Sequence, residues 1–157
     1  MKSVLFLCTG NSARSILAEA YLNQAAGGRF RAYSVGSQPA GRVNQFALEL
    51  LRKGGLPTSG ARSKSWDEFA RPDAPKIDFV FTVCDSAAAE VCPVWPGHPV
   101  TAHWGVPDPA AVEGTDEQKR RAFKAAFTAL ARRIDLFLAL PMEQVAVKKK
   151  LDEIGRG

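Results

Sequence analysis

The chain has 157 residues, enough for one domain whose core needs neither disulfides nor a structural metal, and we expect that domain to span residues 1–140. No apolar run reaches membrane-spanning length and no secretory signal is visible, so we expect a cytoplasmic protein without a membrane partner. The net charge of +5 is compatible with binding of an anionic substrate or a nucleic acid. The basic block at residues 148–150 lacks interleaved aromatic residues, so we expect no nucleic-acid partner. We interpret residues 141–157 as a solvated basic tail.

The N-terminal third alternates between apolar runs and helical patterns. Residues 3–8 form an unbroken apolar run that predicts a buried parallel strand. A helical pattern over residues 15–24 ends before Gly27 and Gly28, and residues 30–35 predict a second strand. Asn44 can cap a further helix, which ends before the next glycine pair.

The remaining elements continue this alternation. A short helix is expected at residues 66–69, a third strand at 77–83 and a weaker fourth at 99–104. Thr115 and Gln118 form a capping box for the longest helix. One apolar stripe follows it, formed by Phe123, Phe127, Leu130, Ile134 and Phe137. The order predicts an α/β three-layer sandwich with a central parallel sheet of about four strands, in which ligands bind beyond the carboxyl ends of the strands.

The segment CTGNSARS begins where the first strand ends. All five residues between Cys8 and Arg14 are small, and the loop leads into a helix whose first turn has unpaired N–H groups. Such a loop can turn several amides toward one tetrahedral oxyanion, while the Arg14 guanidinium holds two of its oxygens. The predicted substrate-binding residues are Thr9, Gly10, Asn11, Ser12, Ala13, Arg14 and Ser15.

The same amides and guanidinium are expected to lower the pKa of Cys8 and make it a nucleophile at neutral pH. Ser15 is placed to donate a hydrogen bond to the sulfur, and Asn11 can brace the loop. The alternative is that Cys8 is a small buried residue that closes a strand. Three cysteines favour reactive thiols over a disulfide framework, and the spacings, with His98 and His103 included, indicate no zinc site.

With CTGNSARS at this position, the chain resembles the low-molecular-weight protein tyrosine phosphatase family, whose first strand is followed by a cysteine, five residues, an arginine and a serine. The similarity extends to HWGVPDP, where the family carries a general acid before a proline; Asp108 stands there. The resemblance implies the phosphatase fold and implies that Asp108 protonates the departing oxygen. The alternative for Asp108 is a turn that begins at Asp-Pro.

Within the family, the sequence is most similar to the thioredoxin-coupled arsenate reductases. Tyrosine phosphatases usually have tyrosine after Asp-Pro, whereas this chain has Ala110, and TVCDSAAAEVCPVWPG carries Cys84 and Cys92. The resemblance implies that Cys8 attacks arsenate, that Cys84 attacks the Cys8 sulfur and releases arsenite, and that Cys92 then attacks Cys84. The resulting disulfide is reduced by an external thiol donor, with thioredoxin expected, and no tightly bound cofactor is implied. The role would be arsenic detoxification.

Departures from the pattern leave rival interpretations open. Ala13 stands where many relatives have another cysteine, outside the three-thiol relay, and the interval between Cys84 and Cys92 is slightly long. The segment 85–91 reads as a marginal helix that can loop out as Cys92 moves inward. The nearest rival function is a phosphatase that hydrolyses phosphotyrosine or small phosphomonoesters through a Cys8 phosphoenzyme. A noncatalytic anion-binding protein is the rival from another class.

Some relatives hold a potassium ion beside the anion loop. The resemblance implies a possible potassium site at Asn11, Glu19, Ser34 and Asp67. The alternative roles are a helix-surface position for Glu19 and a turn position for Asp67.

Overall fold

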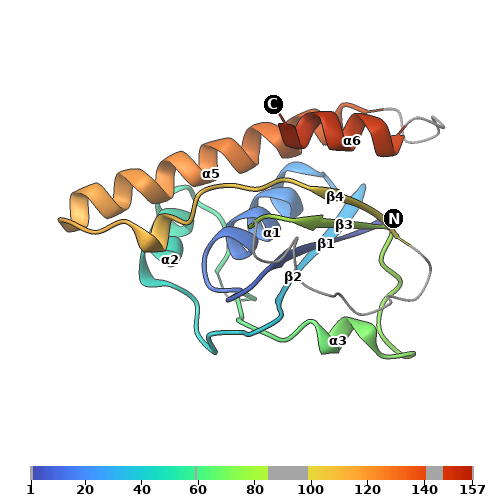
Figure 1. The fold of residues 1–157 in the computed structure, drawn as a ribbon, viewed down its shortest axis with the longest axis horizontal. Helices are drawn as coiled ribbons and strands as arrows, with labels where there is room; N and C mark the ends of the chain where they lie inside the picture. The colour runs from blue at the N-terminus through green and yellow to red at the C-terminus, as the bar shows by residue number, and fades with distance from the viewer. Residues whose placement is uncertain (1, 59, 85–98, 141–146, 157) are drawn as a thin grey trace.

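The computed structural model describes residues 2–58, 60–84, 99–140 and 147–156. In these residues four parallel strands form one sheet in the order β2-β1-β3-β4 (Figure 1). The strands are β1 (Lys2–Cys8), β2 (Phe30–Gly36), β3 (Phe79–Thr82) and β4 (Val100–His103). The four-stranded parallel α/β architecture predicted from the sequence is confirmed.

Helices lie on both faces of this sheet. On one face α1 (Arg14–Ala25) packs against α5 (Asp116–Leu138), and on the other lies the short α3 (Asp67–Ala70) (Figure 1). The side chains of β2 alternate between the two: Phe30 contacts Phe137 of α5, whereas Tyr33 contacts Phe69 of α3. This alternation places the sheet in the middle of three layers.

Two helices begin at the polar capping residues that the sequence predicts. Asn44 Oδ1 accepts a hydrogen bond from Phe46 N at the start of α2 (Gln45–Lys53). Thr115 and Gln118 form the predicted capping box at the start of α5. The predicted stripe of α5 faces the core, with Phe137 packed edge-on against Phe81, which stacks on Trp104 at 3.8 Å between ring centroids.

The C-terminal segment differs from the solvated tail expected for it. Residues of this segment form α6 (Val147–Arg156), which packs against the edge strand β4. Leu151 is fully buried, and its carbonyl accepts a hydrogen bond of 3.0 Å from the indole Nε1 of Trp104. The basic residues of this segment led to the expectation of a solvated tail. The packing of this helix against an edge strand of the sheet becomes evident only in the tertiary structure.

No helix in the described ranges combines the length and the apolar character needed to cross a membrane.

Candidate active site

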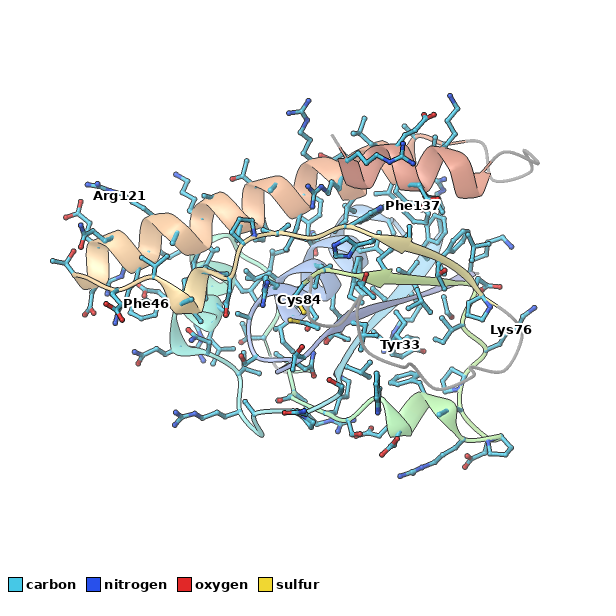
Figure 2. The ribbon with its side chains drawn as sticks, in the orientation of Figure 1. Tyr33, Phe46, Lys76, Cys84, Arg121 and Phe137 are labelled. Carbon is cyan, nitrogen blue, oxygen red and sulfur yellow. The ribbon has the colours of Figure 1, made fainter. Side chains whose placement is uncertain are left out.

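Three of the predicted reactive residues, Cys8, Cys84 and Asp108, end or follow strands at the carboxyl edge of the sheet. Cys8 ends β1, Gly36 ends β2 directly beside it in the register, and Cys84 follows β3 by two residues. Asp108 lies in the loop after β4 and caps the short helix η1 (Pro109–Ala111). Figure 2 shows Cys84 at this edge. Parallel strands bring their carboxyl ends together, so these residues from distant parts of the chain share one site.

Three carbonyl groups of the anion loop are bound by the segment that follows β2. The carbonyls of Thr9, Gly10 and Ser12 accept hydrogen bonds of 2.8–2.9 Å from the backbone N–H groups of Gln38, Ala40 and Asn44, in that order. In a planar trans peptide the next N–H points opposite to the carbonyl, and the described peptide bonds are all trans. The N–H groups that follow these carbonyls therefore point away from residues 38–44, and the Gly10 N–H lowers the pKa of Cys8.

Gly36 allows β2 to approach the loop this closely. A Cβ atom at Gly36 would lie 3.0 Å from both the Cβ and the backbone N of Asn11, a distance that real Cβ contacts rarely reach. Glycine is therefore required at the end of β2.

Asn11 braces the loop from within. It is fully buried and has a φ of 45°, a left-handed conformation that asparagine tolerates better than most residues. Its Oδ1 accepts a hydrogen bond from Lys64 N, and its Nδ2 donates one to Ser15 Oγ, both at 2.8 Å. Since Ser15 Oγ accepts from Asn11, its own proton can be donated elsewhere. The donation to the Cys8 sulfur stays a prediction.

Arg14 joins the anion loop to the loop that carries Asp108. Its Nη1 donates a 2.8 Å hydrogen bond to the carbonyl of Val106, and its Nη2 lies 3.7 Å from Asp108 Oδ2. Val106 in turn donates its N–H to the carbonyl of Val83, at the end of β3. The Asp108 side chain is 43% exposed, so it can exchange protons with water.

Cys8 and Cys84 are buried thiols that do not form a disulfide in this structure. The pKa of Cys8 is raised above its ordinary value, first by its hydrogen bond with Cys84 and next by burial, while Arg14 and the Gly10 N–H act in the opposite direction. The lowered pKa expected from the sequence is therefore not found in this state. The reason is that the neighbouring Cys84 and burial both disfavour the Cys8 thiolate, and the sequence alone does not place Cys84 beside Cys8.

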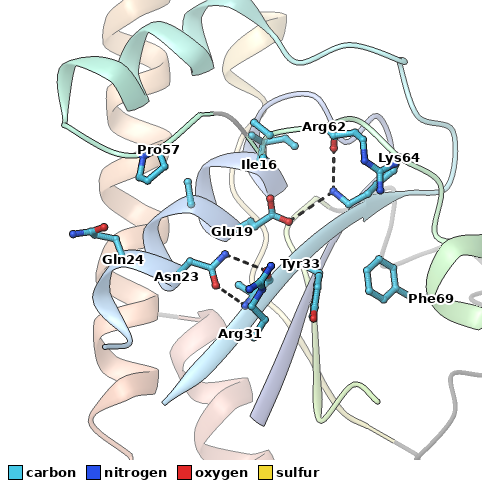
Figure 3. Close-up of a pocket in the computed structure, with 14 residues that line it drawn as sticks. Ile16, Glu19, Asn23, Gln24, Arg31, Tyr33, Pro57, Arg62, Lys64 and Phe69 are labelled. Atoms are coloured by element: carbon cyan, nitrogen blue, oxygen red, sulfur yellow. Dashed lines mark hydrogen bonds and ion pairs between the residues drawn. The ribbon is translucent and has the colours of Figure 1, made fainter. Parts of the chain in front are cut away.

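The four residues considered for potassium are brought together only in part. Glu19 and Ser34 lie beside each other, but Asp67 begins α3 with an exposed side chain. The Lys64 ammonium lies 3.7 Å from Glu19 Oε2 (Figure 3). A cation of the chain itself therefore already faces Glu19, and these residues do not fit a potassium ion. No cluster of three or more histidine, cysteine or acidic side chains suited to a metal occurs in the part of the chain that the structure describes.

Cys92, His98 and the segment 85–91 lie outside the described residues. His103 ends β4, where its Nδ1 is 2.7 Å from Thr82 Oγ1.

Sequence reasoning missed three residues that shape the site: Gly36, Lys64 and Arg133. Arg133 of α5 donates hydrogen bonds to the carbonyls of Trp104 and Gly105, just before the Asp108 loop. The cysteine and glycine that end adjacent parallel strands were visible in the sequence as the ends of two apolar runs. Nothing in the sequence marks Lys64 or Arg133, because basic residues are frequent along this basic chain.

Comparison with known proteins agrees with this geometry. The profile described as low molecular weight phosphotyrosine protein phosphatase matches residues 3–152. The chain belongs to this family. Among curated relatives, an arsenate reductase of Halalkalibacterium halodurans is 38% identical over 136 residues, covering 87% of this chain and 94% of the relative.

Solved structures of the phosphatase family have the same fold. A thioredoxin-dependent arsenate reductase of Corynebacterium glutamicum has a TM-score of 0.57 and 26% identity, covering 87% of this chain and 63% of that one. A low molecular weight protein tyrosine phosphatase of T. tengcongensis has a TM-score of 0.68 and 26% identity, covering 86% of this chain and 96% of that one. Both activities thus occur on this scaffold.

Proposed function

We propose that this member of the phosphatase family is an arsenate reductase that works through a relay of three cysteines. The observation that carries the proposal is the pair of reduced thiols at the anion loop: Cys84 raises the pKa of Cys8, and the Cys84 sulfur lies 3.6 Å from Thr9 Oγ1 of the loop. Hydrolysis of a phosphate ester needs one thiol and a water molecule, whereas the reduction of arsenate needs two electrons and thus two thiols. The second thiol is already beside the first.

The loop binds arsenate because arsenate is a tetrahedral oxyanion like phosphate. The Cys8 proton passes to Cys84 or to solvent, and the Cys8 sulfur attacks arsenic. A hydroxide leaves as water, with a proton supplied by Asp108 from the partly exposed loop. Arg14 neutralises the oxyanion throughout this step, and its contact with Asp108 keeps the acid at the mouth of the loop.

In the second step the Cys84 thiol loses its proton to solvent, and the resulting thiolate attacks the Cys8 sulfur. The sulfur–arsenic bond breaks, its electron pair stays on arsenic, and arsenite leaves together with a Cys8–Cys84 disulfide. Two thiols have then been oxidised and arsenic(V) has been reduced to arsenic(III). The buried position of both sulfurs favours this exchange over a reaction with outside thiols.

Cys92 and thioredoxin complete the proposal. Cys92 attacks Cys84, restores Cys8 and leaves a Cys84–Cys92 disulfide that thioredoxin reduces. The likeness to a thioredoxin-dependent enzyme supports this donor. A reducing compartment such as the cytoplasm is part of the same proposal, since every step starts from a free thiol.

The deciding experiment compares the parent with Cys84→Ser. We expect C84S to lose arsenate-dependent NADPH oxidation, measured with thioredoxin and thioredoxin reductase, while it still hydrolyses p-nitrophenyl phosphate. C8S is the matched control and should lose both activities. Continued arsenate reduction by C84S would refute the relay.

Phosphatase activity is the second candidate. The same loop accommodates a phosphoryl group, and Asp108 is placed to protonate an alcohol leaving group. However, Ala110 offers no aromatic wall for a tyrosine ring, so we expect only weak hydrolysis of aryl phosphates.

A further inference from the structure

Lys64 is a buried lysine close to, but not within, the reactive site. Its side chain is 7% exposed, and its ammonium lies 3.7 Å from Glu19 Oε2 of α1 and donates a 3.0 Å hydrogen bond to the carbonyl of Arg62 (Figure 3). Lysine and glutamate are rarely buried unless they are paired. The burial of this ion pair therefore indicates a structural role that an exposed surface lysine would not have.

Both charges are costly at this position, and each reduces the cost of the other. Burial raises the pKa of Glu19 and lowers the pKa of Lys64, and each partner's charge opposes the shift in the other. Ser34 also lowers the pKa of Glu19, although its buried hydroxyl has no close hydrogen-bond partner among the described residues. The cluster thus consists of one carboxylate, one hydroxyl and one ammonium, and the charges of Arg31 and Arg62 act on it from the rim of the same cavity.

The backbone of Lys64 is tied to the anion loop and to β2. Its N–H donates to Asn11 Oδ1 at 2.8 Å, and its carbonyl accepts from Gly36 N at 2.9 Å. Asn11 then holds Ser15, and Gly36 packs against the loop. Because the Lys64 ammonium is anchored to Glu19, the charge at one end of this residue holds the N–H that positions Asn11 at the other end.

A solvent cation can reach this cluster if the lysine stem is removed. Lys64 and Glu19 both line a cavity of about 430 Å³ (Figure 3). Truncation of Lys64 would leave the carboxylate of Glu19 without its partner and would open space next to the Ser34 hydroxyl. Oxygen ligands of this kind suit a hard monovalent cation.

We propose that Lys64 is a positioning residue, a tethered cation that holds the anion loop in its binding conformation and makes the enzyme independent of potassium. In this role the ammonium pairs with Glu19 where a free cation would otherwise be needed. The inference rests on the oxyanion-binding role of the loop that the proposed function uses, and it does not depend on arsenate reduction.

The test measures inorganic phosphate binding by isothermal titration calorimetry, in choline chloride and in potassium chloride at equal ionic strength and about pH 8, where protonation of Glu19 is disfavoured. The parent is expected to bind phosphate equally in both salts. Lys64→Ala is expected to bind about tenfold more weakly in choline and to recover with a saturable dependence on potassium. Recovery distinguishes a missing charge from general damage to the fold.

Two further variants make the result specific. Lys64→Met removes the charge but keeps most of the stem, so it should bind phosphate weakly in both salts. Lys53→Ala removes an exposed lysine that pairs with Glu49, and it should behave like the parent. Circular dichroism and thermal melting verify that each variant is folded, and K64M provides the charge test if K64A is not.

Three results would overturn the proposal: potassium dependence in the parent, parent-like binding of K64A or K64M in choline, or equal effects of potassium on K64A and K64M. No reductant is present in the titration. Failure here is therefore separate from failure of the arsenate reductase proposal, which the C84S assay tests.

Discussion

At the residue scale, the two described thiols behave as a pair. Cys84 and burial favour the protonated form of Cys8, whereas Arg14 and the Gly10 N–H favour the thiolate. A thiol that stays protonated until an oxyanion is bound is protected from oxidation and alkylation, since the thiolate is the reactive form. The neighbour of Cys8 thus sets its reactivity as much as the anion loop does.

Replacing Cys84 is expected to change the titration of Cys8. Cys84 raises the pKa of Cys8, so Cys84→Ala should lower it and move the pH dependence of Cys8 alkylation to lower pH. The measurement is the rate of labelling by iodoacetamide, followed by mass spectrometry of the Cys8 peptide. Arg14 lowers the pKa of Cys8, so Arg14→Ala should move the profile the opposite way. An unchanged profile in C84A would contradict the pairing.

At the element scale, α6 and α5 position the loop that carries Asp108. Helix α6 covers β4 and fixes Trp104 through the carbonyl of Leu151. Arg133 of α5 holds the carbonyls of Trp104 and Gly105. The Asp108 loop therefore begins from a segment clamped by two helices, which allows the acid to lie close to Arg14.

The contact between α6 and β4 depends on a glycine. A Cβ atom at Gly155 would overlap the carbonyl oxygen of His103 and contact the Trp104 ring. We expect Gly155→Ala to lower the free energy of unfolding by about 1–3 kcal/mol, the usual cost of overpacking. Urea denaturation measures this change. Gly60→Ala is the matched control, since a Cβ there has no neighbour within 4 Å; equal stability of the two variants would show that α6 does not pack as described.

At the scale of the whole molecule, the anion loop is held by segments far from it in the sequence. Backbone N–H groups within residues 38–44 donate hydrogen bonds to the carbonyls of the loop. The N–H of Lys64 donates to the Asn11 side chain, and the carbonyl of Val106 accepts a hydrogen bond from Arg14. Each segment follows or precedes a different strand. The loop can bind an oxyanion only when these segments are folded around it. Oxyanion binding should therefore raise the free energy of unfolding of the whole domain.

Phosphate is expected to raise the melting temperature of the protein. At a phosphate concentration of about 100 Kd the stabilisation is about 2.7 kcal/mol, or roughly 5–10 °C for a chain of this size. Arg14→Ala should remove most of this shift, because it deletes the guanidinium that faces the oxyanion. Arg52→Ala, which alters an exposed arginine in the last turn of α2, should keep it. Differential scanning fluorimetry with matched chloride controls decides the matter, and an equal shift in R14A would contradict the assigned role of Arg14.

Local sequence predicted most of the architecture. An unbroken apolar run marks β1, and helix starts need polar caps, so β1, Asn44 and Thr115 could be recognised from neighbouring residues alone. β2 was recognised from apolar residues between two glycine-containing turns, although Arg31 and Ser34 interrupt them. The anion loop was also visible, because small residues between a strand and a helix are a local pattern. Family resemblance then extended these observations to Asp108 and Cys84.

The remaining features depend on contacts between distant segments. Helix α6 is stabilised by an edge strand about 50 residues earlier, and the sequence interpretation overlooked the helical spacing of Leu151 and Ile154 within the basic segment. The direction of the Cys8 pKa shift depends on a sulfur 76 positions away, and the role of Lys64 depends on a glutamate from α1. The sequence by itself determined which strands, caps and loop the chain can form; only the tertiary structure decided which charges and thiols share a buried site, because electrostatic interactions depend on distance and burial rather than on order along the chain.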